Sequence, residues 1–68
     1  MTIDIVVNGE ARSVPTGQTV LALLQTLELD PAQVAVELNR RIVKQPLWEH
    51  TEVPAGAELE IVQFVGGG

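Results

Sequence analysis

The sequence contains no cysteine, so no disulfide can form, and its single histidine, His50, cannot make a metal cluster alone. A domain of 68 residues rarely gains more than about 3–5 kcal/mol of net stability from its core, and small domains often add disulfides or metals for that reason. We therefore expect stability to come from packing of the apolar residues, which make up 46% of the chain. The absence of cysteine also fits a reducing cytoplasm.

Basic residues are scarce, with four against nine acidic residues and a formal net charge of −5. Nucleic acids and anionic membranes both reward lysine and arginine, so neither is expected as a partner. No apolar run is long enough to span a bilayer, and residues 1–4 lack the basic and apolar regions of a signal peptide, so none is expected. These observations favour a cytoplasmic protein whose partners present a basic surface.

Residues for catalysis are few. There is no cysteine nucleophile, Ser13 has no base beside it in sequence, and the carboxylates are spread over outward-facing or turn positions. No glycine-rich phosphate loop precedes a helix. The chain is therefore predicted to be a carrier or substrate of other enzymes, not an enzyme.

The first half of the chain predicts a hairpin followed by a helix. Apolar residues alternate over 2–7, Asn8-Gly9 is a strong hairpin signal, and 10–14 returns as a second strand. A helix is expected over 19–28, with Thr19 as its N-cap. Its apolar stripe comprises Val20, Leu23, Leu24 and Leu27. Asp30-Pro31 is expected to end the helix.

The second half predicts strands over 34–38, 41–43 and 58–64, with an irregular segment over 45–51. Leu47 and Trp48 of that segment are expected to cover an open end of the core. Pairing the first strand with the last places both centrally and lays the helix on one face. We therefore predict an α+β β-grasp fold with a mixed sheet of four or five strands, formed by residues 1–65 and followed by a flexible glycine tail.

The last strand has an outward apolar side. If Leu59 and Ile61 face the helix, alternation turns Val62 and Phe64 to the opposite face of the sheet. Acidic residues, including Asp4, would rim this patch, and exposed apolar patches with polar rims commonly mark partner surfaces. The predicted docking residues are Val6, Glu58, Glu60, Val62, Phe64 and Val65. Alternatively, the strand bends or the loop around Trp48 covers Phe64.

Three glycines, Gly66, Gly67 and Gly68, end the sequence. A glycine run is narrow and conformationally free, and three extended residues span at most about 10–11 Å. Such an arm can carry the Gly68 carboxylate into the active site of another protein, where adenylation would activate its acyl carbon toward a sulfur nucleophile. The alternative is a frayed chain end without function.

The whole chain resembles the ThiS family, the ubiquitin-like sulfur carriers of thiamine biosynthesis. The segments that carry the resemblance are Val7-Asn8-Gly9, residues 34–39, Ile42-Val43, Trp48 and residues 60–68. One difference is Asn39-Arg40-Arg41, where many relatives have Asn-Gly. An arginine there implies a different turn geometry, because positive φ is uncommon outside glycine.

The resemblance implies the partners and the modified residue. An E1-like adenylyltransferase (ThiF) would adenylate Gly68 with ATP, and a sulfur relay from a cysteine desulfurase would convert it to a thiocarboxylate. Thiazole synthase (ThiG) would then receive the sulfur, with Gly66 and Gly67 as the threading segment. No bound cofactor is implied, since the activating partner consumes the ATP.

Other functions share these features. The small subunit of molybdopterin synthase has the same fold and a Gly-Gly end, although such chains tend to be longer. Carriers for cysteine or thioamide synthesis, and ubiquitin-like modifiers that join their terminal glycine to lysines, also fit. A plain interaction module would have the fold with a tail of no function.

Overall fold

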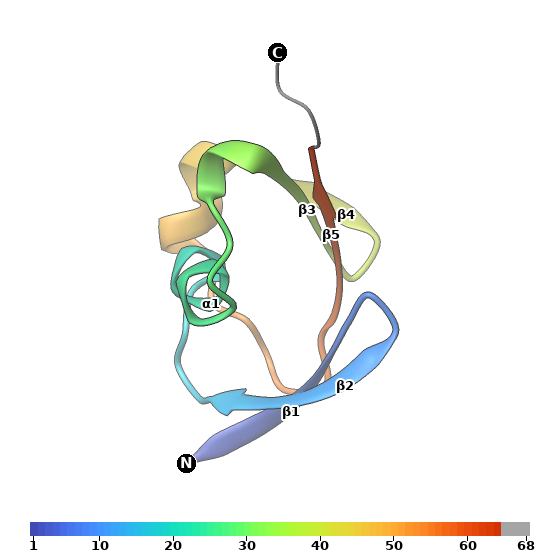
Figure 1. The fold of residues 1–68 in the computed structure, drawn as a ribbon. Coiled ribbons are helices and arrows are strands. Elements are labelled where there is room, and N and C mark those ends of the chain that lie inside the picture. The colour runs from blue at the N-terminus through green and yellow to red at the C-terminus, as the bar shows by residue number, and fades with distance from the viewer. Residues whose placement is uncertain (65–68) are drawn as a thin grey trace.

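One mixed sheet, built from five strands within residues 1–64, forms one layer of the fold, and an α-helix packs on one of its faces (Figure 1). The computed structural model describes residues 1–64. The strands lie in the order β2-β1-β5-β3-β4. Their bounds are β1 (Thr2–Val7), β2 (Glu10–Pro15), β3 (Val34–Leu38), β4 (Arg41–Val43) and β5 (Glu58–Gln63). The predicted β-grasp arrangement is confirmed.

The first and last strands pair in parallel at the centre of the sheet, through Val6 with Glu58 and Val7 with Leu59. All other neighbouring strands are antiparallel. The helix α1 (Val20–Thr26) follows β2, and two 3-10 helices, η1 (Pro31–Gln33) and η2 (Gln45–His50), flank the β3–β4 hairpin in sequence. No helix within residues 1–64 is long and apolar enough to cross a bilayer.

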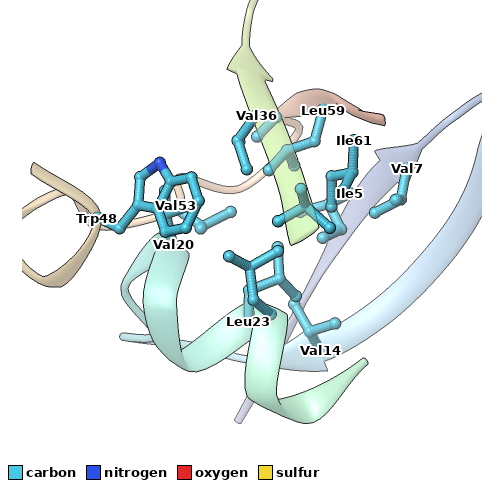
Figure 2. Packing of buried hydrophobic residues seen from close by; sticks show 13 residues of the cluster. Ile5, Val7, Val14, Val20, Leu23, Val36, Trp48, Val53, Leu59 and Ile61 are labelled. Carbon is cyan, nitrogen blue, oxygen red and sulfur yellow. The ribbon is translucent and has the colours of Figure 1, made fainter. Parts of the chain in front are cut away.

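The core lies between α1 and the sheet (Figure 2). On α1, Val20, Leu23 and Leu24 have no exposed surface, as the apolar spacing predicts. The buried residues that surround them are Ile5, Val7, Val14, Val34, Val36, Trp48, Val53, Ala57, Leu59 and Ile61. Because burying each large aliphatic side chain contributes about 1.5–3 kcal/mol, this cluster stabilises the fold without disulfides.

The segment η2 covers the core with only one of the two residues expected to do so. Trp48 is 3% exposed and its Nε1–H donates to the Val43 carbonyl at 2.7 Å. Leu47, in contrast, is 53% exposed, so its predicted place over the core is wrong. Neighbouring residues on a helical turn point in different directions, and η2 turns only the tryptophan inward.

Helix α1 begins as predicted and ends early. The Thr19 hydroxyl accepts from the Ala22 N–H at 3.1 Å, which confirms the N-cap. The helix ends at Thr26, not at Asp30-Pro31, because Glu28 adopts a left-handed conformation with φ of 60°. The Leu29 N–H donates to the Leu24 carbonyl and the Glu28 N–H to the Gln25 carbonyl, the two bonds of a Schellman motif. The Asp30 carboxylate instead caps η1 through the Ala32 N–H.

Glycine in place of Glu28 is expected to stabilise the protein. Glycine is favoured at a position after a helix that adopts the left-handed conformation, because it has no Cβ to clash with the neighbouring carbonyl. We expect Glu28→Gly to raise the free energy of unfolding by about 0.5–1 kcal/mol, measured by urea denaturation. Glu49→Gly, inside η2, is the control and is expected to destabilise. A loss of stability in Glu28→Gly would contradict this account of the helix end.

Two asparagines at hairpin tips hold β5 in place. The Asn8 side chain donates to the Ile61 carbonyl at 3.0 Å and accepts from the Ile61 N–H at 2.7 Å, which extends the short β1–β5 pairing. Asn39 makes the equivalent pair with Glu58, through its backbone N–H at 2.7 Å and its side-chain oxygen at 2.9 Å. Both asparagines have φ of 50°, a conformation that asparagine tolerates better than most residues.

The turn between β3 and β4 differs from the sequence expectation. Leu38 pairs with Arg41, so Asn39 and Arg40 form a two-residue turn. Both have positive φ, 50° and 69°, as in the type I′ turns that fit the twist of a hairpin. The expected change of geometry is therefore wrong: Arg40 takes the conformation usual for glycine, because the twist of the paired strands requires it.

Candidate functional site

The face of the sheet opposite α1, called here the open face, carries the candidate docking residues. Leu59 and Ile61 point into the core, so the alternating residues of β5 point away from it. Val62 is 58% exposed and Phe64 is 55% exposed, as the alternation predicted. The alternative, in which the loop around Trp48 covers Phe64, is not seen.

An apolar groove lies on the open face where β3, β4 and β5 run side by side. Its volume is about 120 Å³, and its apolar lining includes Ala35, Ile42 and Val62. Ala35 pairs directly with Val62, and Ile42 is 75% exposed, the largest exposed fraction of any large apolar residue in 2–64. An aliphatic side chain exposed to that degree gains little from burial within this chain, so it is available for a partner.

Carboxylates form the next row of the same face. Glu37 of β3 lies directly opposite Glu60 of β5 in the antiparallel register, and Ile42 lies opposite Glu37 on the other side. Both glutamates line the groove. Within residues 1–64 neither glutamate is in an ion pair, so no cation of that part of the chain neutralises their charges.

The end of β5 connects the open face to the glycine tail. The Phe64 N–H donates to the Gln33 carbonyl at 2.6 Å, which keeps the backbone aligned with the start of β3 as far as Phe64. The predicted docking residue Val65 and the tail residues Gly66, Gly67 and Gly68 lie outside the described residues, as does the predicted domain boundary at 65/66.

The structure separates two parts of the predicted docking set. Val6 is half-buried and lies beside Glu58, its partner on β5. Val62 lies four positions along β5 from Glu58, about 13 Å at the rise of an extended strand. Asp4 lies further along β1, opposite Ser13. Glu60 and Val62 thus line the groove, whereas Val6, Glu58 and Asp4 do not. Phe64 is exposed beyond the end of β5 and is not part of the lining.

Sequence reasoning missed three residues of the groove, Ala35, Glu37 and Ile42. Alternation along β3 does turn Ala35 and Glu37 away from the helix, so their face was readable from the sequence. Their place beside Val62 and Glu60 depends on the β3–β5 register. Ile42 sits in a strand of three residues, too short for a periodic signal.

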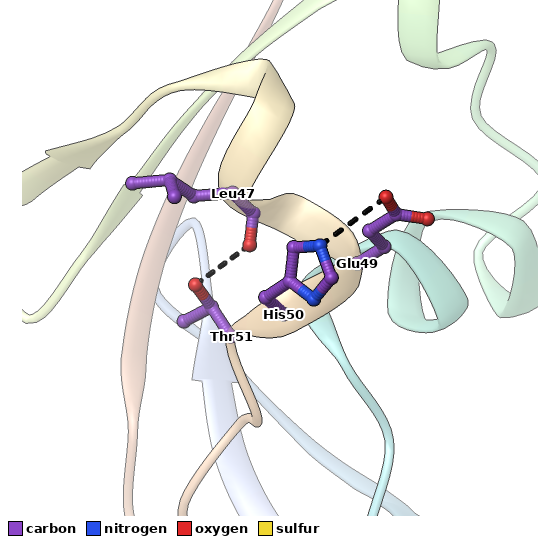
Figure 3. Close-up of polar contacts among 4 residues, drawn as sticks. All are labelled: Leu47, Glu49, His50 and Thr51. Carbon is purple, nitrogen blue, oxygen red and sulfur yellow. Dashed lines mark hydrogen bonds and ion pairs between the residues drawn. The ribbon is translucent and has the colours of Figure 1, made fainter.

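Other parts of the described chain offer little chemistry. The ion pair between His50 Nε2 and Glu49 Oε1, at 3.3 Å on η2, is largely exposed (Figure 3). The Thr51 hydroxyl beside it donates to the Leu47 carbonyl at 2.8 Å and so ends the turn. Among residues 1–64 no three histidine or acidic side chains are grouped to hold a metal ion.

A larger cavity of about 270 Å³ opens on the α1 side, between the β1–β2 hairpin and the end of the helix. Its charged lining residues are Glu10 and Arg12, and Leu27 and Leu29 form part of its apolar wall. Asn8 also lines it, but both ends of its side-chain amide already bond to Ile61. Among residues 1–64, those that line this cavity therefore include no nucleophile with an adjacent base.

Comparison with known proteins places these features in context. The ThiS family model matches residues 5–68. The chain is 32% identical over 66 residues to the sulfur carrier protein ThiS of Escherichia coli, covering 97% of this chain and 100% of that protein. A crystal structure of the thiamine biosynthesis protein ThiS from Geobacter metallireducens superposes with a TM-score of 0.84 at 30% identity, covering 97% of this chain and 100% of that one.

A second kind of relative is much longer. The chain is 45% identical over 66 residues to a thiazole synthase of Paramagnetospirillum magneticum, and the match covers 97% of this chain. It covers only 20% of that protein. The segment of a thiazole synthase is thus more similar in sequence to this chain than the free-standing carrier of Escherichia coli is.

Proposed function

The chain belongs to the ThiS family, and on that basis we propose that it is a sulfur carrier of thiamine biosynthesis whose Gly68 carboxylate carries the sulfur. The observation that carries the proposal is the family match, which extends through the glycines to residue 68. In this role the chain is not a catalyst. Its partners perform the chemistry on the carboxylate that it presents.

The chemistry begins with two displacement reactions, the first at the α-phosphorus of ATP and the second at the acyl carbon of Gly68. A Gly68 carboxylate oxygen attacks the α-phosphorus of ATP, which forms an acyl adenylate and releases pyrophosphate. A sulfur nucleophile from a relay protein, supplied by a cysteine desulfurase, then attacks the acyl carbon and displaces AMP. The attacking sulfur is the outer sulfur of a persulfide on the relay protein, so the product of this step is an acyl disulfide. A second thiol then attacks the relay's own sulfur, forms a disulfide with it and thereby supplies the two electrons that break the acyl disulfide. A thiocarboxylate remains in place of the carboxylate. Glycine suits this position because no side chain crowds the acyl carbon.

The body of the protein presents the tail to its partners. The activating enzyme is an E1-like adenylyltransferase (ThiF) that consumes ATP, and the proposed site of the reaction is the cytoplasm. Gly66 and Gly67 pass through a narrow entrance, while the open face next to Phe64 docks on the partner. Support comes from the exposed side chains of Val62 and Phe64, because exposed apolar residues on one face of a sheet commonly mark a surface that binds a partner.

The sulfur acceptor is a thiazole synthase. The similarity of this chain to a segment of a thiazole synthase supports the pairing, because joining two sequences in one chain raises their effective concentration. Separate chains must instead recognise each other through their surfaces. The open face is the surface that this fold leaves for that purpose.

Intact-mass analysis tests the proposal. After incubation with the adenylyltransferase, ATP and a sulfur source, we expect the mass to change by one oxygen-to-sulfur replacement. Fragmentation should place the change at Gly68. Omission of ATP is the control and should leave the mass unchanged.

Two outcomes would redirect the proposal. Conjugates to lysines of other chains would indicate a ubiquitin-like modifier. Transfer of the sulfur to a molybdopterin precursor instead of thiazole synthase would indicate the small subunit of molybdopterin synthase. An unchanged mass with every activating enzyme of the organism would contradict a carrier function.

A further inference from the structure

The groove on the open face combines two features that a stable isolated chain would avoid. Its apolar residues Ile42 and Val62 are 75% and 58% exposed. Beside them Glu37 and Glu60 lie directly opposite each other on neighbouring strands. Side chains in that relation have their Cβ atoms about 4.5–5.5 Å apart, and like charges so placed destabilise a sheet. Neither feature serves the fold, since the core is complete on the other face.

The chain has arginines close to the two glutamates in the β3–β4 hairpin, and a different register of β3 with β4 would bring one of them to the open face. Arg40 and Arg41 occupy the β3–β4 hairpin, immediately before Ile42. The register nevertheless sets Arg41 opposite Leu38, on the other face of the strand from Ile42. Within residues 1–64 no ion pair joins Arg40, Arg41 or Lys44 to Glu37 or Glu60. The two carboxylates are therefore left for a cation from outside the chain.

We propose that Glu37 and Glu60 form the polar half of a docking site for thiazole synthase. An arginine or lysine of the synthase lies between the two carboxylates. An aliphatic side chain next to that cation fills the groove of Ala35, Ile42 and Val62. Charge complementarity identifies the side chain of this occupant as a cation. The similarity of this chain to a segment of a thiazole synthase identifies the partner that supplies it. Two carboxylates on adjacent strands match the planar, many-donor guanidinium of arginine, and the apolar floor matches its aliphatic neighbour. The groove volume of about 120 Å³ suits a side chain rather than a whole ligand.

The proposed role of Glu37 and Glu60 in binding predicts an effect on stability that a purely structural role of these residues does not. Repulsion between Glu37 and Glu60 lowers the stability of the free chain, and the incoming cation removes that repulsion only in the complex. The same carboxylates thus weaken the isolated carrier and strengthen its complex. Substitution of either one should change stability and binding in opposite directions.

The first arm of the test uses the free chain. Glu37→Gln and Glu60→Gln are each expected to raise the thermal midpoint by about 1–4 °C, since removing one charge of the pair ends the repulsion. The double variant should add little beyond either single one. Glu10→Gln is the matched control, because it removes the same charge from β2 at a position on the opposite face, across from Val7. A lower midpoint in both single variants would overturn the inference.

The second arm measures binding to the thiazole synthase of the same organism by calorimetry. Each glutamine variant is expected to bind about 10-fold more weakly or worse, with a smaller dependence on salt than the wild type. Ile42→Ser should also weaken binding while changing stability little. Leu47→Ser, at an exposed position on η2, is its control.

The inference rests on the proposed function, and the outcomes separate the two. Absence of any binding by the wild-type chain would overturn both the thiazole synthase partnership and this site. Wild-type binding that both glutamine variants retain in full would overturn the site alone. Weaker binding joined to greater stability in the same variants would support it.

Discussion

Deletion of Gly68 is expected to lower the yield of thiocarboxylate by about 100-fold or more. The deletion moves the terminal carboxylate back by one residue, about 3.3–3.6 Å along an extended chain. A reacting group misplaced by only about 1 Å can cost about 100-fold in rate. The measurement is a timed intact-mass assay with the adenylyltransferase, ATP and a sulfur source.

The same deletion should leave the fold intact. Within residues 1–64 the buried core cluster ends at Ile61, so the free energy of unfolding is expected to stay within about 0.5 kcal/mol of the wild type. Gly68→Ala is the control for length, since it keeps the carboxylate in place and adds one methyl group. It should retain more activity than the deletion. Full activity of the shortened chain, or a large loss of stability, would contradict the assignment of the tail as a reactive arm.

Trp48→Ala is expected to lower the free energy of unfolding by about 3–5 kcal/mol. The side chain is 3% exposed and covers the core beside Val20 and Val53, as Figure 2 shows, and its loss also removes the hydrogen bond to Val43. Because a domain of this size has a net stability of only about 3–5 kcal/mol, much of the variant should be unfolded. Circular dichroism in increasing urea measures this without tryptophan fluorescence.

The neighbouring residue supplies the control. Leu47→Ala removes an aliphatic side chain from the same 3-10 helix, but that side chain is 53% exposed. We expect a change of no more than about 0.5 kcal/mol. Comparable losses from the two substitutions would mean that η2 packs as a unit and that the tryptophan is not its anchor.

Much of the fold was predictable from side-chain periodicity. The alternation over 2–7 and 34–38 and the helical spacing over 20–27 reproduce β1, β3 and the buried face of α1. The helix end was mispredicted because Glu28 gives no local signal for a left-handed conformation. The two bonds of the Schellman motif stabilise it there, and Leu29 packs against the core immediately afterwards.

The candidate docking site was also predictable from the sequence only in part. The outward direction of Val62 and Phe64 follows from alternation within β5 alone, and the structure agrees. The groove also needs Ile42, from a strand of three residues without a periodic signal. The single patch expected around Val6 and Val62 was too broad, because β1 pairs with only the start of β5.

The sequence by itself determined the chemistry that this protein can offer: no thiol, a shortage of cations, and a glycine tail whose carboxylate is the candidate reactive group. It also determined which residues of β1, β3 and β5 share a face of the sheet, because that depends on alternation over neighbouring residues. Only the tertiary structure decided which residues become neighbours. Glu37 and Glu60 stand 23 positions apart in sequence and meet because the antiparallel register of β3 and β5 places them opposite each other. That register is set cooperatively, by burial of Val36 and Ile61 on one face and by the Asn39 bonds to Glu58 at the strand end.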